Sequence, residues 1–104
     1  MLNFQLATTE EVLRELGQRL RAQRLQRLIT QEELAARAGV ALGSVKKLES
    51  SGGTTLHTFV RVIHALSLTD DIAGILQLKA SSSIADMERA ELATRKRARR
   101  PRGA

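Results

Sequence analysis

A chain of 104 residues is long enough for one folded domain and leaves nothing over for a second. The absence of cysteine excludes disulfides, thiolate metal sites and cysteine nucleophiles, and two phenylalanines without tryptophan or tyrosine argue against single-strand binding by base stacking. The formal net charge of +6 comes from the last ten residues, because residues 1–94 carry equal numbers of basic and acidic side chains. A basic end is a general signal for polyanions and by itself selects no partner.

Residues 1–8 are expected to form an N-terminal arm. Its apolar residues Leu2, Phe4 and Leu6 alternate with other side chains, and this period of two predicts a short strand-like segment. A lone strand would need a second copy of the chain, or another protein, to pair with its backbone. A frayed terminus is the alternative.

Residues 9–80 carry helical patterns and are expected to form the folded domain. Thr8 with Glu11, and Thr30 with Glu33, make two capping boxes, which predict one helix after residue 8 and another from about residue 31.

The first helix has an apolar stripe of leucines that runs from Leu13 to Leu28 at helical spacing. Arg24 interrupts the apolar side of this helix. An arginine in such a place either extends toward solvent or pairs with a buried acid.

Gly39 is expected to end the second helix, since glycine tolerates the left-handed backbone, and a third helix is predicted from about Leu42 to Ser50. Two short helices joined by about three residues that include a glycine are the signature of a helix-turn-helix.

Two further helices are predicted before residue 80. The first spans about residues 56–66 with Leu56 at the start of its buried face. The second is capped by Thr69, with Ile75 and Leu76 among its inward side chains. The sequence thus predicts a compact all-α domain of five helices.

Residues 81–104 are expected to lie outside this domain. A serine linker precedes a short amphipathic segment with Ile84, Met87 and Leu92, which should be marginally stable on its own. A flexible basic tail follows, with Arg95, Lys96, Arg97, Arg99, Arg100 and Arg102.

The stretch LGQRLRAQRLQRLITQEELAARAGVALGSVKKLESSG, continued by LHTFVRVIHALSL, resembles the Cro/CI-type (XRE family) DNA-binding domain over about residues 9–80. TQEELA, AGV and the Val-x-x-Leu-Glu end of the third helix carry the resemblance most specifically. It implies a five-helix Cro/CI-repressor-like helix-turn-helix fold. In such domains an arginine of the first helix pairs with the glutamate that ends the third, so the resemblance implies a structural ion pair between Arg24 and Glu49.

The same resemblance implies that the third helix enters the major groove of double-stranded DNA, and that Gln31 touches a phosphate and braces this helix. The start Ala41-Leu42-Gly43 is poor in hydrogen-bond donors, so sequence preference should depend partly on DNA shape. The residues expected to contact DNA are Gln31, Leu42, Gly43, Ser44, Lys46 and Lys47.

A single domain of this kind makes few contacts, which favours a homodimer on the pseudo-palindromic operator of its own gene, paired through the N-terminal arm or the fifth helix. The small domain followed by a separate segment and a basic end is similar to HipB-type antitoxins. That similarity implies a repressor of its own operon that associates with a HipA-like serine/threonine kinase toxin. The alternatives are a stand-alone phage-type repressor, and a protein-interaction module that inhibits a kinase and uses the helix-turn-helix as scaffold.

No catalytic function, cofactor or metal is expected. His57 and His64 lie seven residues apart on one predicted helix without an acid pair or nucleophile beside them. No apolar run is long enough to cross a membrane, and the N-terminus lacks the pattern of a signal peptide, so the expected location is the cytoplasm, on the nucleoid. The basic tail would contact DNA non-specifically, contact the partner protein, or only keep the end soluble.

Overall fold

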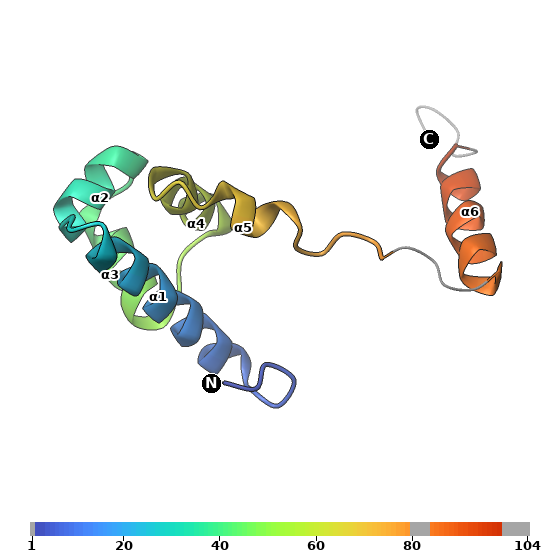
Figure 1. The fold of residues 1–104 in the computed structure, drawn as a ribbon, viewed down its shortest axis with the longest axis horizontal. Helices are drawn as coiled ribbons and strands as arrows, with labels where there is room; N and C mark the ends of the chain where they lie inside the picture. Colours follow the sequence, from blue (N-terminus) through green and yellow to red (C-terminus); the bar gives the residue numbers. More distant parts are fainter. Residues whose placement is uncertain (1, 80–83, 99–104) are drawn as a thin grey trace.

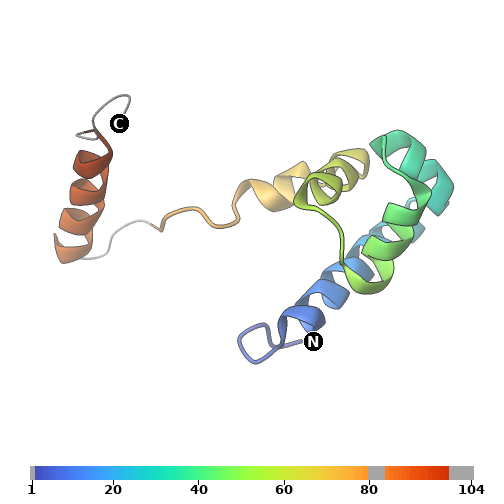
Figure 2. The same cartoon turned by 180° about the vertical axis from the view of Figure 1, so that it is seen from behind.

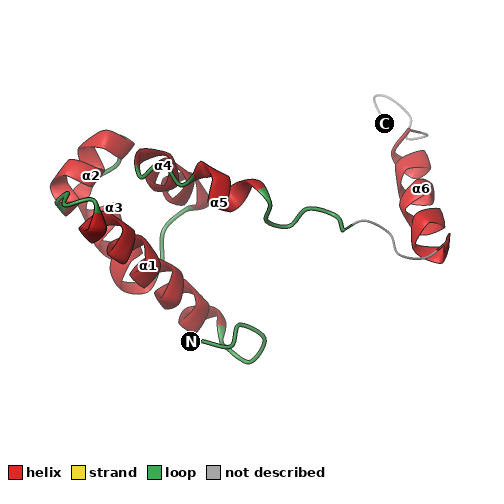
Figure 3. Cartoon of the chain, in the orientation of Figure 1, coloured by secondary structure: helices red, strands yellow, loops and turns green. Residues whose placement is uncertain are grey.

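The computed structural model describes residues 2–79 and 84–98, with the side chains of the second stretch described from Met87 to Lys96. Six helices and no strand occur in these two stretches, so the expected all-α class is confirmed (Figure 3). The helices are α1 (Thr9–Gln26), α2 (Gln31–Ala38), α3 (Leu42–Ser51), α4 (Leu56–Ala65), α5 (Thr69–Ala73) and α6 (Ile84–Ala98). The first five form one body, and α6 stands away from it (Figures 1 and 2).

Both predicted capping boxes are present, and they set the starts of α1 and α2. The backbone N–H of Glu11 donates to the Thr8 hydroxyl at 3.1 Å, and the N–H of Thr8 donates to the Glu11 carboxylate at the same distance. The bond from the Thr8 backbone N–H to the carboxylate, and second the Thr8 hydroxyl beside it, lower the pKa of Glu11. Thr30 and Glu33 make the same reciprocal pair ahead of α2.

Gly39 produces the turn between α2 and α3. Its φ of +68° is left-handed, and the N–H of the next residue, Val40, donates back to the carbonyl of Ala35 at 3.1 Å. The chain therefore reverses within three residues, and α3 packs against both α1 and α2. This is the helix-turn-helix that the glycine spacing predicted.

The core lies where α1 to α4 meet. Leu34 and Val45 are completely buried and join α2 to α3, while Val62 in α4 and Leu66 directly after that helix extend the same cluster. Ala35 and Ala38 are small enough to let these helices approach closely. The core holds α3 by its inner face and leaves the outer face of that helix free.

Two leucines that were expected inside, one on each of the first and fourth predicted helices, are on the surface. Leu28 is 91% exposed because α1 ends at Gln26, and Leu28 adopts a left-handed φ of +57° in the turn that follows. Leu56 is 76% exposed because it is the first residue of α4, ahead of the turn that packs on the core.

The fifth helix is also shorter than expected. It starts with Thr69 itself, after Leu68, and ends at Ala73, so Ile75 and Leu76 lie beyond it and are 55% and 97% exposed. Thr69 therefore does not cap the helix, and the inward placement of Ile75 and Leu76 was wrong.

The two chain ends also differ from expectation. Residues 3–6 close a turn, in which the N–H of Leu6 donates to the carbonyl of Asn3, rather than an extended strand. A single strand has no backbone to pair with in one chain, and a local turn satisfies the same groups. At the other end α6 includes Arg95, Lys96 and Arg97, so this part of the basic tail is helical. Arg99, Arg100 and Arg102 lie outside the described residues.

Candidate nucleic-acid interface

A buried ion pair fixes α3 against α1. The Arg24 Nε lies 2.7 Å from Glu49 Oε2 and its Nη2 lies 2.9 Å from Oε1, so the guanidinium holds the carboxylate through two parallel bonds. The two side chains are 8% and 3% exposed. The remaining Nη1 donates to the carbonyl of Ile29 at 2.9 Å. The hydrogen bonds to Glu49 raise the pKa of Arg24, so the guanidinium stays charged.

Gln31, the first residue of α2, joins the same carboxylate. Its Nε2 donates to Glu49 Oε1 at 3.1 Å, so one acid at the end of α3 receives bonds from α1 and from the start of α2. The side-chain amide of Gln31 is thus directed inward. At the N-terminus of α2 a phosphate would find backbone N–H groups rather than this amide.

Two glycines permit the close approach of α1 to α3. A Cβ on Gly17 would collide with the backbone carbonyl oxygen of Leu48 in the middle of α3. A Cβ on Gly52, which ends α3 with a φ of +74°, would collide with the carbonyl oxygen of Leu13. No sequence pattern indicates either contact, because both depend on how two helices cross.

The outer face of α3 carries the expected DNA-contacting side chains. Lys46 and Lys47 are exposed, whereas Val45 before them and Leu48 after them are buried. Gly43 is exposed, and no other atom of the described residues lies within 4 Å of where its Cβ would be. The N-cap is Ala41, which offers no side-chain bond to the first turn of α3.

Leu42 and Ser44 are half-buried, so they are less available than the lysines. Leu42 packs against the core with one side and faces a shallow hollow with the other. This hollow lies between α3 and the start of α2, and it is lined by Thr30, Gln31, Glu32, Leu42 and Lys46. The hollow combines one cation and one anion, so the net positive charge on the outer face of α3 comes from Lys46 and Lys47.

The basic residues of α6 do not extend this face. Arg95 and Lys96 are exposed, but Arg95 pairs with Glu91 at 2.7 Å one turn before it. Figures 1 and 2 place α6 well away from α3. Among the described side chains, the structure therefore brings Gln31, Leu42 and Lys46 together and leaves Arg95 and Lys96 apart from them.

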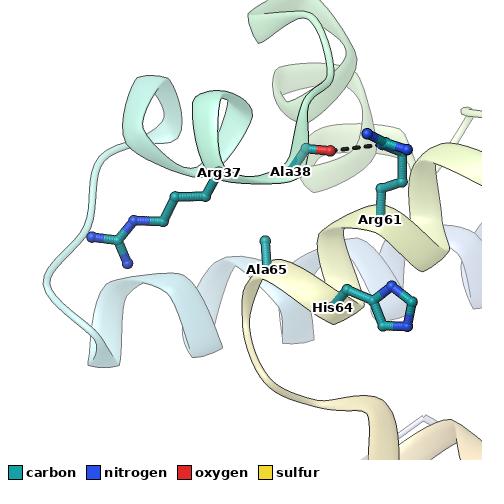
Figure 4. A pocket seen from close by; sticks show the side chains of 5 residues that line it. All are labelled: Arg37, Ala38, Arg61, His64 and Ala65. Atoms are coloured by element: carbon teal, nitrogen blue, oxygen red, sulfur yellow. Dashed lines mark hydrogen bonds between the residues drawn. The ribbon is translucent and has the colours of Figure 1, made fainter.

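The two histidines lie on the exposed side of α4. His64 lines a shallow pocket with Arg37, Ala38, Arg61 and Ala65 (Figure 4). Arg61 Nε donates to the carbonyl of Ala38 at 2.8 Å, which satisfies an oxygen at the end of α2, and the side chains of Arg37 and His64 diverge. Among the described residues no group of three His, Cys, Asp or Glu side chains could hold a metal, and none of the helices there is long and apolar enough to span a membrane.

The chain matches a known protein family. A family model described as helix-turn-helix covers residues 20–72, from the second half of α1 to Ile72 in α5. This is more than half of the chain, and it contains the Arg24–Glu49 ion pair, the turn and all of α3. No curated protein matches the sequence.

Proposed function

Since this chain belongs to the helix-turn-helix family of DNA-binding transcription regulators, we propose that it is a sequence-specific repressor of its own operon, and that α3 reads the major groove. The observation that carries the proposal is the fixed position of α3. Arg24, Gln31 and the core hold its inner face, and Lys46 and Lys47 extend from its outer face.

The proposed contacts follow from this geometry. Lysine ammonium groups can bind guanine O6 and N7 or a phosphate, and both lysines are free of salt bridges with the described residues. Gly43 lets the backbone approach DNA closely, and Leu42 offers its outer side to a thymine methyl. Ser44, half-buried, is placed for a phosphate or a base edge. Gln31 acts mainly as a brace, with the α2 backbone as the phosphate contact.

Because few residues of one domain would contact DNA bases, we propose that a homodimer binds two half-sites of a pseudo-palindromic operator. The centres of the half-sites would lie about one helical turn, or 34–36 Å, apart. The neutral charge of residues 1–94 supports this, since a single domain without net positive charge gains little affinity from phosphates alone.

We further propose an antitoxin role, in which the protein associates with a HipA-like serine/threonine kinase toxin. The support is architectural: a small helix-turn-helix body is followed by a separate helix with a basic end. A stand-alone repressor would have the same body but would need no kinase. Co-expression with the product of the neighbouring gene, followed by affinity purification and a kinase assay, separates the two.

The test of the repressor proposal is a fluorescence-anisotropy titration at near-physiological salt. DNA from upstream of the protein's own gene is compared with a scrambled duplex of the same length and composition. A preference of about a thousandfold or more is expected for a specific repressor. Equal and weak binding to both duplexes would contradict it and would favour a protein-interaction module that uses the helix-turn-helix as scaffold.

A further inference from the structure

The two ends of α3 are held in different ways. Glu49, near the C-terminal end, receives bonds from Arg24 and Gln31, so α1 and the start of α2 hold that end directly. The N-terminal end, which would read DNA, begins at Leu42 after Ala41, and Ala41 gives the first turn no side-chain cap. The position of this end therefore depends on the packing of its inner face and on the turn that precedes it.

Arg61 of α4 contacts this turn. Its Nε donates to the carbonyl of Ala38, the last residue of α2, at 2.8 Å (Figure 4). Its Nη2 lies 2.7 Å from where a Cβ on Gly39 would be, so the guanidinium lies beside the backbone of the glycine at which the chain turns. A cation at this place also faces the negative end of the α2 dipole. Arg61 thus joins α4 to the two residues from which the chain leaves toward α3.

A small movement of this turn would displace the residues that read bases. At 1.5 Å per residue, Leu42 lies about 10 Å along the helix from Glu49, so a rotation of about 10° about Glu49 would move Leu42 by about 2 Å. A binding site has to be held to within about 0.5 Å for directional contacts such as those to base edges. The attraction of a flexible lysine to a phosphate tolerates more, because it depends on charge rather than on direction. Loss of the Arg61 bond should therefore reduce specificity more than affinity.

We propose that Arg61 is a positioning residue for DNA reading, which orients the N-terminal end of α3 through Ala38 and Gly39 and does not itself contact DNA. Arg24 and Arg61 then hold the two ends of α3, one from α1 and the other from α4, and the core holds the inner face between them. The proposal rests on the repressor proposed above and assigns part of its specificity to a residue outside α2 and α3.

The test uses Arg61→Met in the full-length chain, because methionine keeps an apolar stem and removes the hydrogen bond. We expect at least about a tenfold loss of preference for the operator over the scrambled duplex, with the affinity for the scrambled duplex unchanged. Arg61→Lys should restore most of the preference, since its ammonium can donate to the same carbonyl. Arg37→Ala is the matched control and should keep the preference. It removes another cation of the same shallow pocket, and the Arg37 side chain points away from Arg61 (Figure 4).

Three results would overturn the proposal. An unchanged preference in Arg61→Met would show that the bond to Ala38 does not orient α3. An equal loss of affinity for both duplexes would show that Arg61 binds a phosphate instead. A loss of helical content, measured by circular dichroism, would show that Arg61 stabilises the whole fold rather than the position of one helix.

Amide hydrogen exchange of the free protein, followed by NMR, tests the positioning role without DNA. The N–H groups of Gly39 and Val40 donate to carbonyls of α2. In Arg61→Met both should exchange at least about tenfold faster, while the amides in the middle of α1 keep their protection.

These measurements separate the positioning role from the repressor on which it rests. Faster exchange at Gly39 and Val40 in Arg61→Met, in a protein whose unmodified form binds both duplexes equally, would support the role of Arg61 and contradict the repressor. Operator preference in the unmodified protein, with unchanged exchange in Arg61→Met, would overturn the positioning role and leave the repressor standing.

Discussion

The backbone of Gly17 in α1 lies directly against the carbonyl oxygen of Leu48 in α3. Leu48 is the residue before Glu49, so the same short segment of α3 that contacts Gly17 also supplies the acid that Arg24 binds. Close backbone approach and the ion pair therefore act on one point of α3. The ion pair depends on the close approach, since it can form with this geometry only where the helices come this near.

Gly17→Ala is expected to destabilise the fold by at least about 2 kcal/mol, because the new Cβ meets backbone, which cannot rotate away as a side chain can. The measurement is urea denaturation followed by circular dichroism. Gly43→Ala is the matched control, since it is another helical glycine and has open space around it. That control should keep or slightly raise stability, as alanine is the better helix former. Equal effects of the two substitutions would contradict the close contact.

Arg24→Leu is expected to cost about 3–5 kcal/mol of unfolding free energy, because it leaves the Glu49 carboxylate buried without its cation. The double variant Arg24→Leu/Glu49→Leu removes both charges and should be more stable than Arg24→Leu alone. Thermal denaturation of the four members of this cycle measures the coupling. If the losses of unfolding free energy in the two single variants simply add in the double variant, Arg24 and Glu49 do not stabilise the fold as a pair.

Leu28 should be replaceable with a gain in stability. It adopts a left-handed φ of +57° while 91% exposed, a conformation that costs a non-glycine residue roughly 1–2 kcal/mol. Glycine would relieve this strain, but it also raises the conformational entropy of the unfolded chain, which offsets part of the gain. Leu28→Gly should therefore raise the free energy of unfolding by about 1 kcal/mol or less.

Leu25→Gly, inside α1 and a partly exposed leucine as well, should instead destabilise by about 1 kcal/mol or more. The melting temperatures of the two variants, compared with that of the unmodified protein, measure both changes in stability. A loss of stability in Leu28→Gly would mean that the exposed leucine makes a stabilising contact, for example in an assembly.

The features that the sequence predicted correctly are those decided within a few residues. Thr8 with Glu11 and Thr30 with Glu33 cap helices through bonds three residues apart, so their spacing alone predicts both starts. Gly39 ends α2 for a similarly local reason, the left-handed backbone that only glycine adopts easily. These local signals place the turn and both of its helices to within a residue or two.

The features that were missed depend on where helices end and cross. Periodicity placed Leu28, Leu56 and Ile75 inside because it continues past helix ends and does not show which turn reaches the core. The bond of Gln31 to Glu49 depends on how α2 approaches α3, which no pattern in either segment contains. The pairing of Arg24 with Glu49 came from the family resemblance, and the DNA contacts expected of α3 stay predictions.

Lys46→Ala combined with Lys47→Ala is expected to abolish operator preference and leave the fold intact, because both side chains are exposed and contribute no core contact. Anisotropy titrations on the operator and on the scrambled duplex measure the effect, and circular dichroism checks the fold. Arg14→Ala with Arg21→Ala, two exposed cations on α1, is the control for lost charge and should keep the preference. Wild-type specificity in the lysine variant would refute the role assigned to α3.

Removal of the C-terminal positive charge is expected to weaken binding to all DNA by a similar factor. Substitution of Arg95, Lys96, Arg97, Arg99, Arg100 and Arg102 by glutamine is preferable to deletion of residues 95–104, because α6 extends to Ala98 and deletion would shorten it. Each basic residue that neutralises a phosphate contributes about 0.9 to the slope of log K against log salt, so the slope should fall. The measurement is the salt dependence of anisotropy on both duplexes. A loss confined to the operator would show that these residues take part in specific recognition, and an unchanged slope would show that they do not contact DNA.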